Sequence, residues 1–120
     1  MKKKKLNIIL ISKEEVTEYN LLGEYDEENN IIYYNENNNL VTKMKLDLKN
    51  KELTRENKDY YLEYKFIENE ETENKMVLKE LDKNIFINIK TDKFKLEENK
   101  LEIIYTILDS DEQVTYKVKF

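Results

Sequence analysis

The chain has 120 residues, which is the length of one ordinary domain. Its 21 basic and 26 acidic residues give a net charge of −5, and nine Tyr and four Phe make it too aromatic for a disordered acidic tail. The chain has no Cys and no His, which excludes disulfides, thiolate nucleophiles, imidazole bases and the usual tetrahedral zinc sites.

The amino terminus combines a basic and an apolar segment. Residues 2–5 are all Lys, and residues 6–11 are apolar except for Asn7. A secretory signal has a longer, uninterrupted apolar region that ends at small residues, so this segment is a poor match. We therefore expect residues 1–5 to be a solvated basic leader and residues 6–120 to form a single domain. No apolar stretch approaches the ~18 residues that cross a membrane, so we expect a cytoplasmic protein without membrane contact.

Alternation of apolar and polar residues with a period of two dominates the rest of the chain. It is clearest at the carboxyl end, where Val114, Tyr116 and Val118 alternate with polar residues. The predicted strands, in chain order, are residues 6–11, 17–25, 31–35, 40–48, 51–56, 60–66, 75–81, 85–91, 94–96, 101–107 and 114–120.

Short polar segments separate these strands, among them residues 26–30, 57–59 and 69–74. The Asn run at residues 37–39 is typical of a turn, because Asn tolerates left-handed backbone geometry. Connections of this length suit hairpins, and an open meander would leave two long edges exposed to aggregation. We therefore predict an all-β fold, an antiparallel up-and-down barrel of about eight or more strands.

Few residues could support catalysis or metal binding. Ser12 and Ser110 are the only serines, and neither has a His to act as its base. Carboxylates are too numerous to single out a pair, no acidic segment has the spacing of an EF-hand, and one Gly cannot build a phosphate loop. The negative net charge disfavours nucleic acid as a partner. We predict no catalytic residue, no metal site and no cofactor.

Arg55 is the only arginine in a chain that otherwise uses Lys for its positive charges. Alternation places it on the same face as Leu53, so it points inward if Leu53 does. A guanidinium inside a barrel needs a carboxylate partner or a position at the wet mouth, and Glu36, at the end of a predicted strand, is the candidate partner. The alternative, which remains open, is an ordinary exposed Arg at a strand end.

Several short motifs resemble, in order, those of a family of bacterial proteins of unknown function, the YwiB-like calycin proteins. Leu-Gly-Glu-Tyr at residues 22–25 and Ile-Ile-Tyr-Tyr-Asn-Glu at residues 31–36 are similar to the family's early motif, and Leu-Thr-Arg at residues 53–55 to a later one. Three further segments follow in the same order, residues 75–78, 88–91 and 101–108. The resemblance implies a calycin-type, lipocalin-like closed barrel whose interior can hold a small molecule, with no established activity or cofactor.

These observations leave two main functions open. The first is a cytoplasmic module that binds a small, partly apolar or acidic ligand inside the barrel, with Arg55, Glu36, Tyr64 and Thr91 as the candidate ligand-binding residues. The second is a structural or protein-interaction module with a filled barrel. An acid/base enzyme using Glu, Tyr or Lys is a third class that no residue requires. The sequence leaves the ligand and the oligomeric state open.

Overall fold

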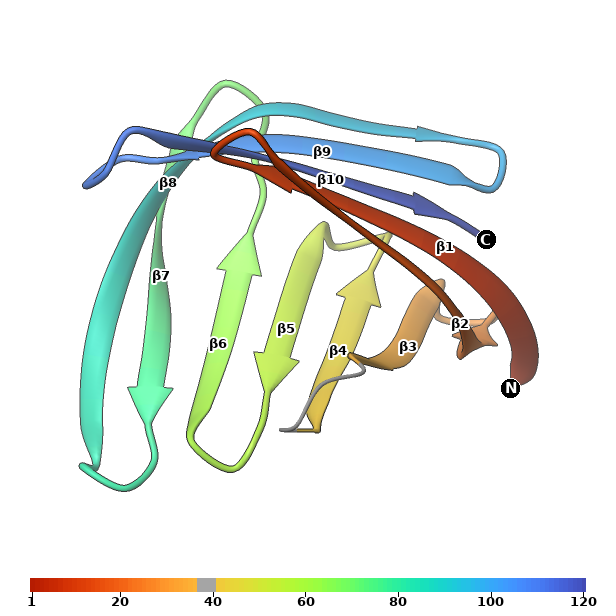
Figure 1. Cartoon of the computed structure of the whole chain (residues 1–120), viewed down its shortest axis with the longest axis horizontal. Helices are drawn as coiled ribbons and strands as arrows, with labels where there is room; N and C mark the ends of the chain where they lie inside the picture. Colours follow the sequence, from red (N-terminus) through yellow and green to blue (C-terminus); the bar gives the residue numbers. More distant parts are fainter. Residues whose placement is uncertain (37–40) are drawn as a thin grey trace.

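The computed structural model describes residues 1–36 and 41–120, and all regular structure among them is β-strand (Figure 1). The strands are β1 Lys2–Ser12, β2 Glu15–Asp26, β3 Ile31–Glu36, β4 Thr42–Asp47, β5 Glu52–Glu56, β6 Tyr60–Lys65, β7 Glu71–Leu78, β8 Lys83–Glu97, β9 Lys100–Ile107 and β10 Glu112–Lys119. This part of the chain contains no helix that is long and apolar enough to span a bilayer.

The ten strands form one closed barrel. Each strand pairs antiparallel with the next along the chain, and β1 pairs with β10 to complete the ring. The predicted all-β, antiparallel, up-and-down barrel is therefore confirmed. Because neighbouring strands are antiparallel, the described connections β1–β2, β5–β6, β7–β8 and β9–β10 lie at one end, which we call the mouth. The chain termini and the connections after the even-numbered strands lie at the other end, which we call the base.

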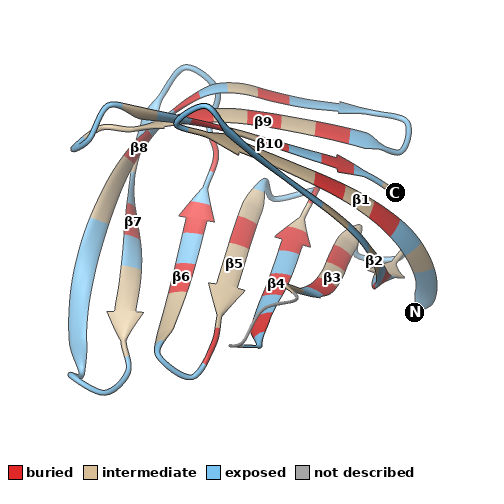
Figure 2. Ribbon diagram, in the orientation of Figure 1, coloured by how far each residue is buried: buried red, intermediate tan, exposed pale blue. Residues whose placement is uncertain are grey.

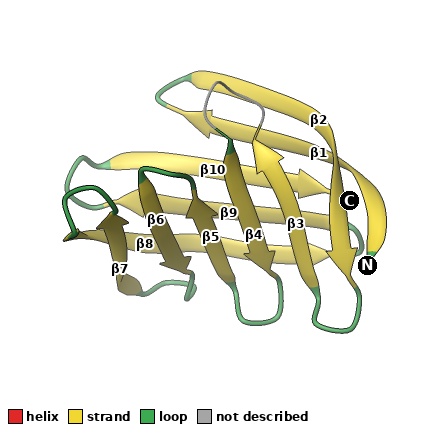
Figure 3. Cartoon of the chain, turned by 90° about the horizontal axis from the view of Figure 1, so that it is seen from below, coloured by secondary structure: helices red, strands yellow, loops and turns green. Residues whose placement is uncertain are grey.

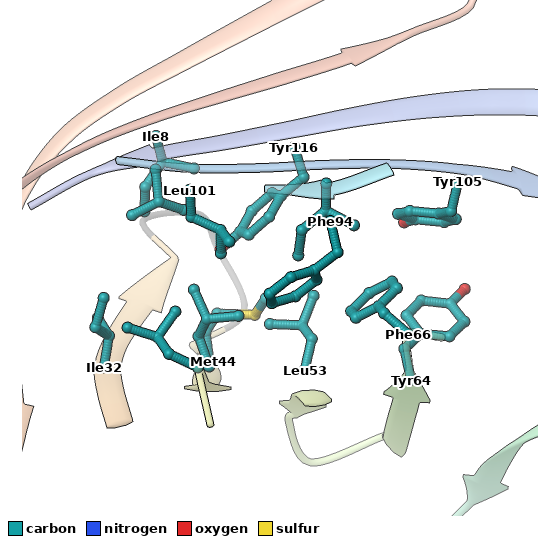
Figure 4. Close-up of a cluster of buried hydrophobic side chains, with 14 of the residues drawn as sticks. Ile8, Ile32, Met44, Leu53, Tyr64, Phe66, Phe94, Leu101, Tyr105 and Tyr116 are labelled. Carbon is teal, nitrogen blue, oxygen red and sulfur yellow. The ribbon is translucent and has the colours of Figure 1, made fainter. Parts of the chain in front are cut away.

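Apolar side chains fill the interior, and bands of buried residues alternate with exposed or half-buried ones along most strands (Figure 2). An aromatic cluster occupies the centre of this core, where the rings of Tyr64, Phe66, Phe94 and Tyr105 lie with their centroids 5.5–6.2 Å apart (Figure 4). Tilted rings at this spacing pack favourably. The buried side chains extend through both halves of the barrel, from Leu101 near the base to Val114 near the mouth.

The amino terminus differs from the expected solvated leader. Strand β1 begins at Lys2, and residues 2–5 pair with the last residues of β2, up to Tyr25. Residues 2–5 pair with β2 but extend beyond the β1–β10 ladder, which begins at Asn7, so Lys side chains on either face can keep their ammonium groups in water. The Lys run is therefore part of the barrel wall.

Two other strand boundaries also differ from expectation. Residues 71–74 belong to β7, although residues 69–74 were predicted to be a connector. The predicted strands 85–91 and 94–96 are one strand, β8, in which a bulge between Thr91 and Lys93 shifts the register and breaks the alternation. The predicted turn at residues 37–39 and the predicted strand start at Leu40 lie outside the described residues.

The ladder between β2 and β3 contains only three residue pairs, from Glu24 with Tyr33 to Asp26 with Ile31. Gly23 immediately precedes this ladder. A Cβ atom at Gly23 would lie 2.8 Å from the carbonyl oxygen of Tyr33 and 2.5 Å from a methyl carbon of Leu6. Glycine thus permits the close approach of β2 to β3, and beyond it toward the mouth the two strands diverge (Figure 3).

The ladder between β6 and β7 is equally short, but a side chain extends it. Asn74 is buried, and its Oδ1 accepts a hydrogen bond of 2.9 Å from the backbone N–H of Lys65. Its Nδ2 donates to the carbonyl oxygen of Ile87 at 3.3 Å, on the other side of β7. Asn74 therefore replaces a missing ladder bond between β6 and β7.

Candidate ligand-binding site

Arg55 lies on β5 with its side chain directed into the mouth half of the barrel. Its Nη2 donates to Oε2 of Glu36 at 2.7 Å. The Arg55 side chain is 37% exposed and that of Glu36 is 10% exposed. The carboxylate partner and the position near solvent that the sequence analysis required are therefore both present.

The strand register explains how Glu36 reaches Arg55 although β4 lies between their strands. One row of inward-facing partners crosses the wall from Tyr34 on β3 through Met44 on β4 and Arg55 on β5 to Leu62 on β6. Glu36 is two residues beyond Tyr34 and thus faces inward one row closer to the mouth. From there its carboxylate contacts the guanidinium diagonally across β4.

Most of the hydrogen-bonding capacity of Arg55 is unused. A guanidinium has five N–H groups, and the one hydrogen bond given to it among the described residues is that to Glu36. Its Nε is buried and has no acceptor among the described residues. A buried donor without an acceptor costs about 1–3 kcal/mol, so Arg55 Nε is an unsatisfied donor in the barrel interior.

Two buried tyrosines face the same interior and have no hydrogen-bond partner among the described residues. The rings of Tyr64 and Tyr105 lie 5.5 Å apart, and both residues are more than nine-tenths buried. Burial raises the pKa of both phenols, and the positive charge of Arg55 opposes this effect in each case. Both groups therefore remain O–H donors at neutral pH.

A second tyrosine pair is already satisfied. The hydroxyls of Tyr34 on β3 and Tyr116 on β10 hydrogen-bond to one another in the interior. Burial is the main cause that raises the pKa of each phenol. Because β1 and β2 separate these strands in the ring, the bond connects two parts of the wall that share no ladder.

The rim of the mouth carries a second carboxylate. Glu112, the first residue of β10, lies 3.4 Å from the Nζ of Lys13 in the β1–β2 turn. Both residues line a hollow of about 260 Å³ together with Leu10, Ser12 and residues from the start of β2. The rim is thus polar, whereas the walls below it are largely apolar.

Thr91 is placed differently from the other predicted site residues. It is fully buried and faces inward as the ladder partner of Tyr105, and its Oγ1 has no partner among the described residues. Its backbone is bound to the β6–β7 connection, with Asn69 N–H donating to its carbonyl at 2.7 Å. The structure thus brings Arg55 and Glu36 into contact and places Tyr64 within the field of Arg55, but no described contact joins Thr91 to them.

Four residues of this region were not predicted from the sequence to belong to the site: Tyr34, Tyr105, Tyr116 and Glu112. Alternation did place Tyr105 and Tyr116 on the apolar faces of their strands, so their burial could be foreseen. The position of Tyr105 within the field of Arg55, and the contact of Tyr116 with Tyr34, depend on the register of strands far apart in the chain. The described residues contain no group of three acidic side chains arranged to hold a metal ion.

These features define a class of protein: a closed, ten-stranded, antiparallel up-and-down β-barrel with a filled base and a polar mouth. A similar solved structure is the crystal structure of the YwiB protein from Bacillus subtilis, with a TM-score of 0.61 over 98% of this chain and 89% of that chain, at 15% sequence identity. At this identity the likeness shows the fold, and it confirms the barrel that the resemblance to the YwiB-like proteins implied. No protein-family model and no curated protein matches the chain.

Proposed function

We propose that the protein is a cytoplasmic binding protein that holds a small, partly apolar molecule with an acidic group in the mouth half of the barrel. The observation that carries this proposal is the unused donor set. Arg55 Nε is buried without an acceptor among the described residues, and the charge of Arg55 acts on the phenols of Tyr64 and Tyr105, which have no described hydrogen-bond partner. A carboxylate has the geometry and charge to accept from such a set.

The surroundings of Arg55 support a ligand with an apolar body. Leu62 and Met44 flank Arg55 in its row, and the aromatic cluster closes the space below. An acidic group bound at Arg55 would leave the rest of the molecule against these side chains. Glu36 neutralises part of the guanidinium charge, which favours a single carboxylate over a multiply charged anion.

The filled base supports the second candidate function, an interaction module without a ligand. The aromatic cluster leaves the base half packed, so a ligand would have to fit in the mouth half. The two candidate functions predict different effects of small carboxylates: a binding protein is stabilised by them, and an interaction module without a ligand site is not.

The experiment measures the melting temperature and the ¹H–¹⁵N NMR spectrum with hexanoate and with hexanamide, which share the apolar body but not the charge. Binding to the folded state raises the melting temperature in proportion to occupancy. Hexanoate is expected to stabilise the wild type and to shift amides near Arg55, and hexanamide to do neither. Arg55→Lys is expected to abolish the difference, because Lys keeps the charge but lacks the planar fork.

Lys79→Met supplies the matched control, because Lys79 forms an exposed ion pair with Glu56 outside the barrel and its loss removes one positive charge. This variant should bind hexanoate as the wild type does. Equal responses to hexanoate and hexanamide, or an unchanged response in Arg55→Lys, would refute a carboxylate site at Arg55. Native mass spectrometry of protein purified from its host then tests for a resident ligand.

A further inference from the structure

Strand β2 has an unpaired edge along most of its length. It pairs with β1 over residues 15–25, but with β3 only from Glu24 onward. On the side away from β1, residues 15–22 have no backbone partner among the described residues. Open edges of this kind are templates for pairing with another strand.

The β1–β2 turn determines which backbone groups point to that edge. Lys13 and Glu14 both have positive φ angles, 50° and 65°, as in a two-residue type I′ hairpin. In such a hairpin the flanking pair, Ser12 and Glu15, exchanges hydrogen bonds, and bonded pairs recur at every second residue. The odd-numbered residues of β2 are therefore bonded to β1, and the N–H and C=O groups of its even-numbered residues point to the open edge.

This edge is accessible. The first four residues of β2, Glu15 to Glu18, are exposed on both faces of the strand, so this end of the hairpin extends beyond the packed barrel (Figures 2 and 3). Further along, the even-numbered side chains stay exposed while Tyr19 and Leu21 turn toward the core. Two of the exposed residues, Val16 and Leu22, are apolar, and each is 66% exposed.

We propose that this edge pairs with the same edge of a second copy of the chain, antiparallel about a two-fold axis at Tyr19. In this register Val16 lies opposite the partner's Leu22, and Glu18 lies opposite the partner's Asn20. All four even-numbered residues from 16 to 22 then find bonding partners, giving about eight backbone hydrogen bonds and a sheet that continues from one barrel into the other.

The neighbouring registers are less favourable. Centring the axis on Glu18 places that carboxylate opposite the partner's Glu18, and like charges directly opposite one another are destabilising. Centring it on Asn20 places Glu18 opposite the partner's Leu22 and leaves Val16 without an apolar neighbour. The two-fold axis at Tyr19 creates two symmetry-related contacts between Val16 and Leu22, so both exposed apolar side chains are buried in each copy. No two carboxylates lie opposite one another in the paired residues 16–22. The side chains therefore favour this register.

Amide hydrogen exchange of the wild type, measured over a concentration series alongside analytical ultracentrifugation, tests the proposal. A dimer is expected at high concentration, with the amides of residues 16, 18, 20 and 22 protected roughly tenfold or more and losing that protection on dilution. Odd-numbered amides of β2 are bonded to β1 and should keep their protection throughout. A monomer at the highest soluble concentration, or a dimer in which the even-numbered amides exchange freely, would overturn the proposal.

Two double variants test the register. In V16K/L22K each Lys faces a Lys of the partner, and the dimer should be lost. In V16K/L22E each Lys faces a Glu, and the dimer should form again. Leu81→Lys is the matched control, because Leu81 is 71% exposed and lies in the β7–β8 connection, so the dimer should be retained. Equal dimerisation of the two double variants would contradict this register.

Discussion

Arg55 and Glu36 form an ion pair across an intervening strand, from β5 to β3, at 2.7 Å. Backbone ladders connect only adjacent strands, so this contact holds three strands in a fixed relation at the mouth. Glu36 is 10% exposed and its partner 37%, which places the pair between a solvated surface bridge and a buried one. Part of the guanidinium therefore remains open to solvent beside the ion pair.

A double-mutant cycle with Glu36→Gln and Arg55→Gln should give a coupling energy of about 1 kcal/mol in urea unfolding, which is the upper range for a partly exposed pair. Each single variant leaves the other charge near the interior without its partner. Each should therefore lose more than half of the free energy of unfolding that the double variant loses. The pair Lys2 and Glu27, which is well exposed on both sides, is the control and should show weaker coupling. Strictly additive effects at Glu36 and Arg55 would mean that the pair contributes nothing.

Gly23→Ala should destabilise the barrel by about 1–3 kcal/mol, as overpacking of a rigid site does. The added Cβ would lie 2.8 Å from the carbonyl oxygen of Tyr33, a backbone atom that cannot move without opening the β2–β3 ladder. Elsewhere in a strand the same change is usually favourable, because Gly is flexible in the unfolded chain. Glu24→Ala, one residue further on an exposed face, is the comparison. Urea unfolding measures both, and an unchanged midpoint for Gly23→Ala would contradict the close approach.

Tyr34→Phe and Tyr116→Phe should each lower the free energy of unfolding by about 1–3 kcal/mol, because each leaves the other hydroxyl buried without a partner. The double variant removes both polar groups, and it should be no less stable than the worse single variant. Chemical denaturation of the three proteins provides the measurement. Additive losses would indicate that each hydroxyl acts independently of the other.

The free energy of unfolding should decrease at alkaline pH because four tyrosines are buried. Burial raises the phenol pKa of Tyr34, Tyr64, Tyr105 and Tyr116 above the ordinary value of about 10. Above that pH the unfolded chain loses phenolic protons that the folded protein retains, so the free energy of unfolding decreases as the pH rises. This contribution is fully present below pH 10 and is lost progressively above it.

Ultraviolet absorbance of tyrosinate, measured together with urea unfolding between about pH 9 and 12, follows both effects. The four buried phenols should ionise only as the barrel unfolds. Ionisation of all nine tyrosines in a single step at pH 10, with the barrel intact, would be inconsistent with their burial.

Asn74→Ala should lower the free energy of unfolding by about 1–3 kcal/mol, because it leaves the Lys65 N–H without its acceptor. The structural effect should be confined to the β6–β7 junction. The amide of Lys65 is expected to exchange faster than in the wild type. Asn74→Asp retains the acceptor for Lys65 but loses the donor to Ile87, so it separates the two contacts. An unaltered exchange rate at Lys65 in Asn74→Ala would show that this bond does not support the β6–β7 junction.

Alternation predicted the strands and the closed barrel because each wall has one apolar and one wet face. It also predicted that Arg55 shares a face with Leu53. A guanidinium there needs a carboxylate, and Glu36 is the candidate because it ends a predicted strand and belongs to the motif that resembles that of the YwiB-like proteins. Alternation did not predict the features in which the period of two is interrupted or the composition is not typical of a strand. The bulge beside Thr91 breaks the period of two, and residues 2–5 are uniformly basic although they form a strand. Tyr34 and Tyr116 meet through a ring closure that no local pattern encodes.

The pairing of β1 with β10 has a consequence for biosynthesis. A ribosome releases the amino-terminal strand first, yet the partner of Asn7 in this ladder is Lys119, next to the last residue of the chain. Until β10 has been synthesised, the nascent chain lacks the strand that closes the ring, and the edges of β1 and β9 stay open. Long-range pairing of this kind is slow to form and prone to aggregation, so the cell must protect an almost finished barrel for longer than a helical domain of equal length.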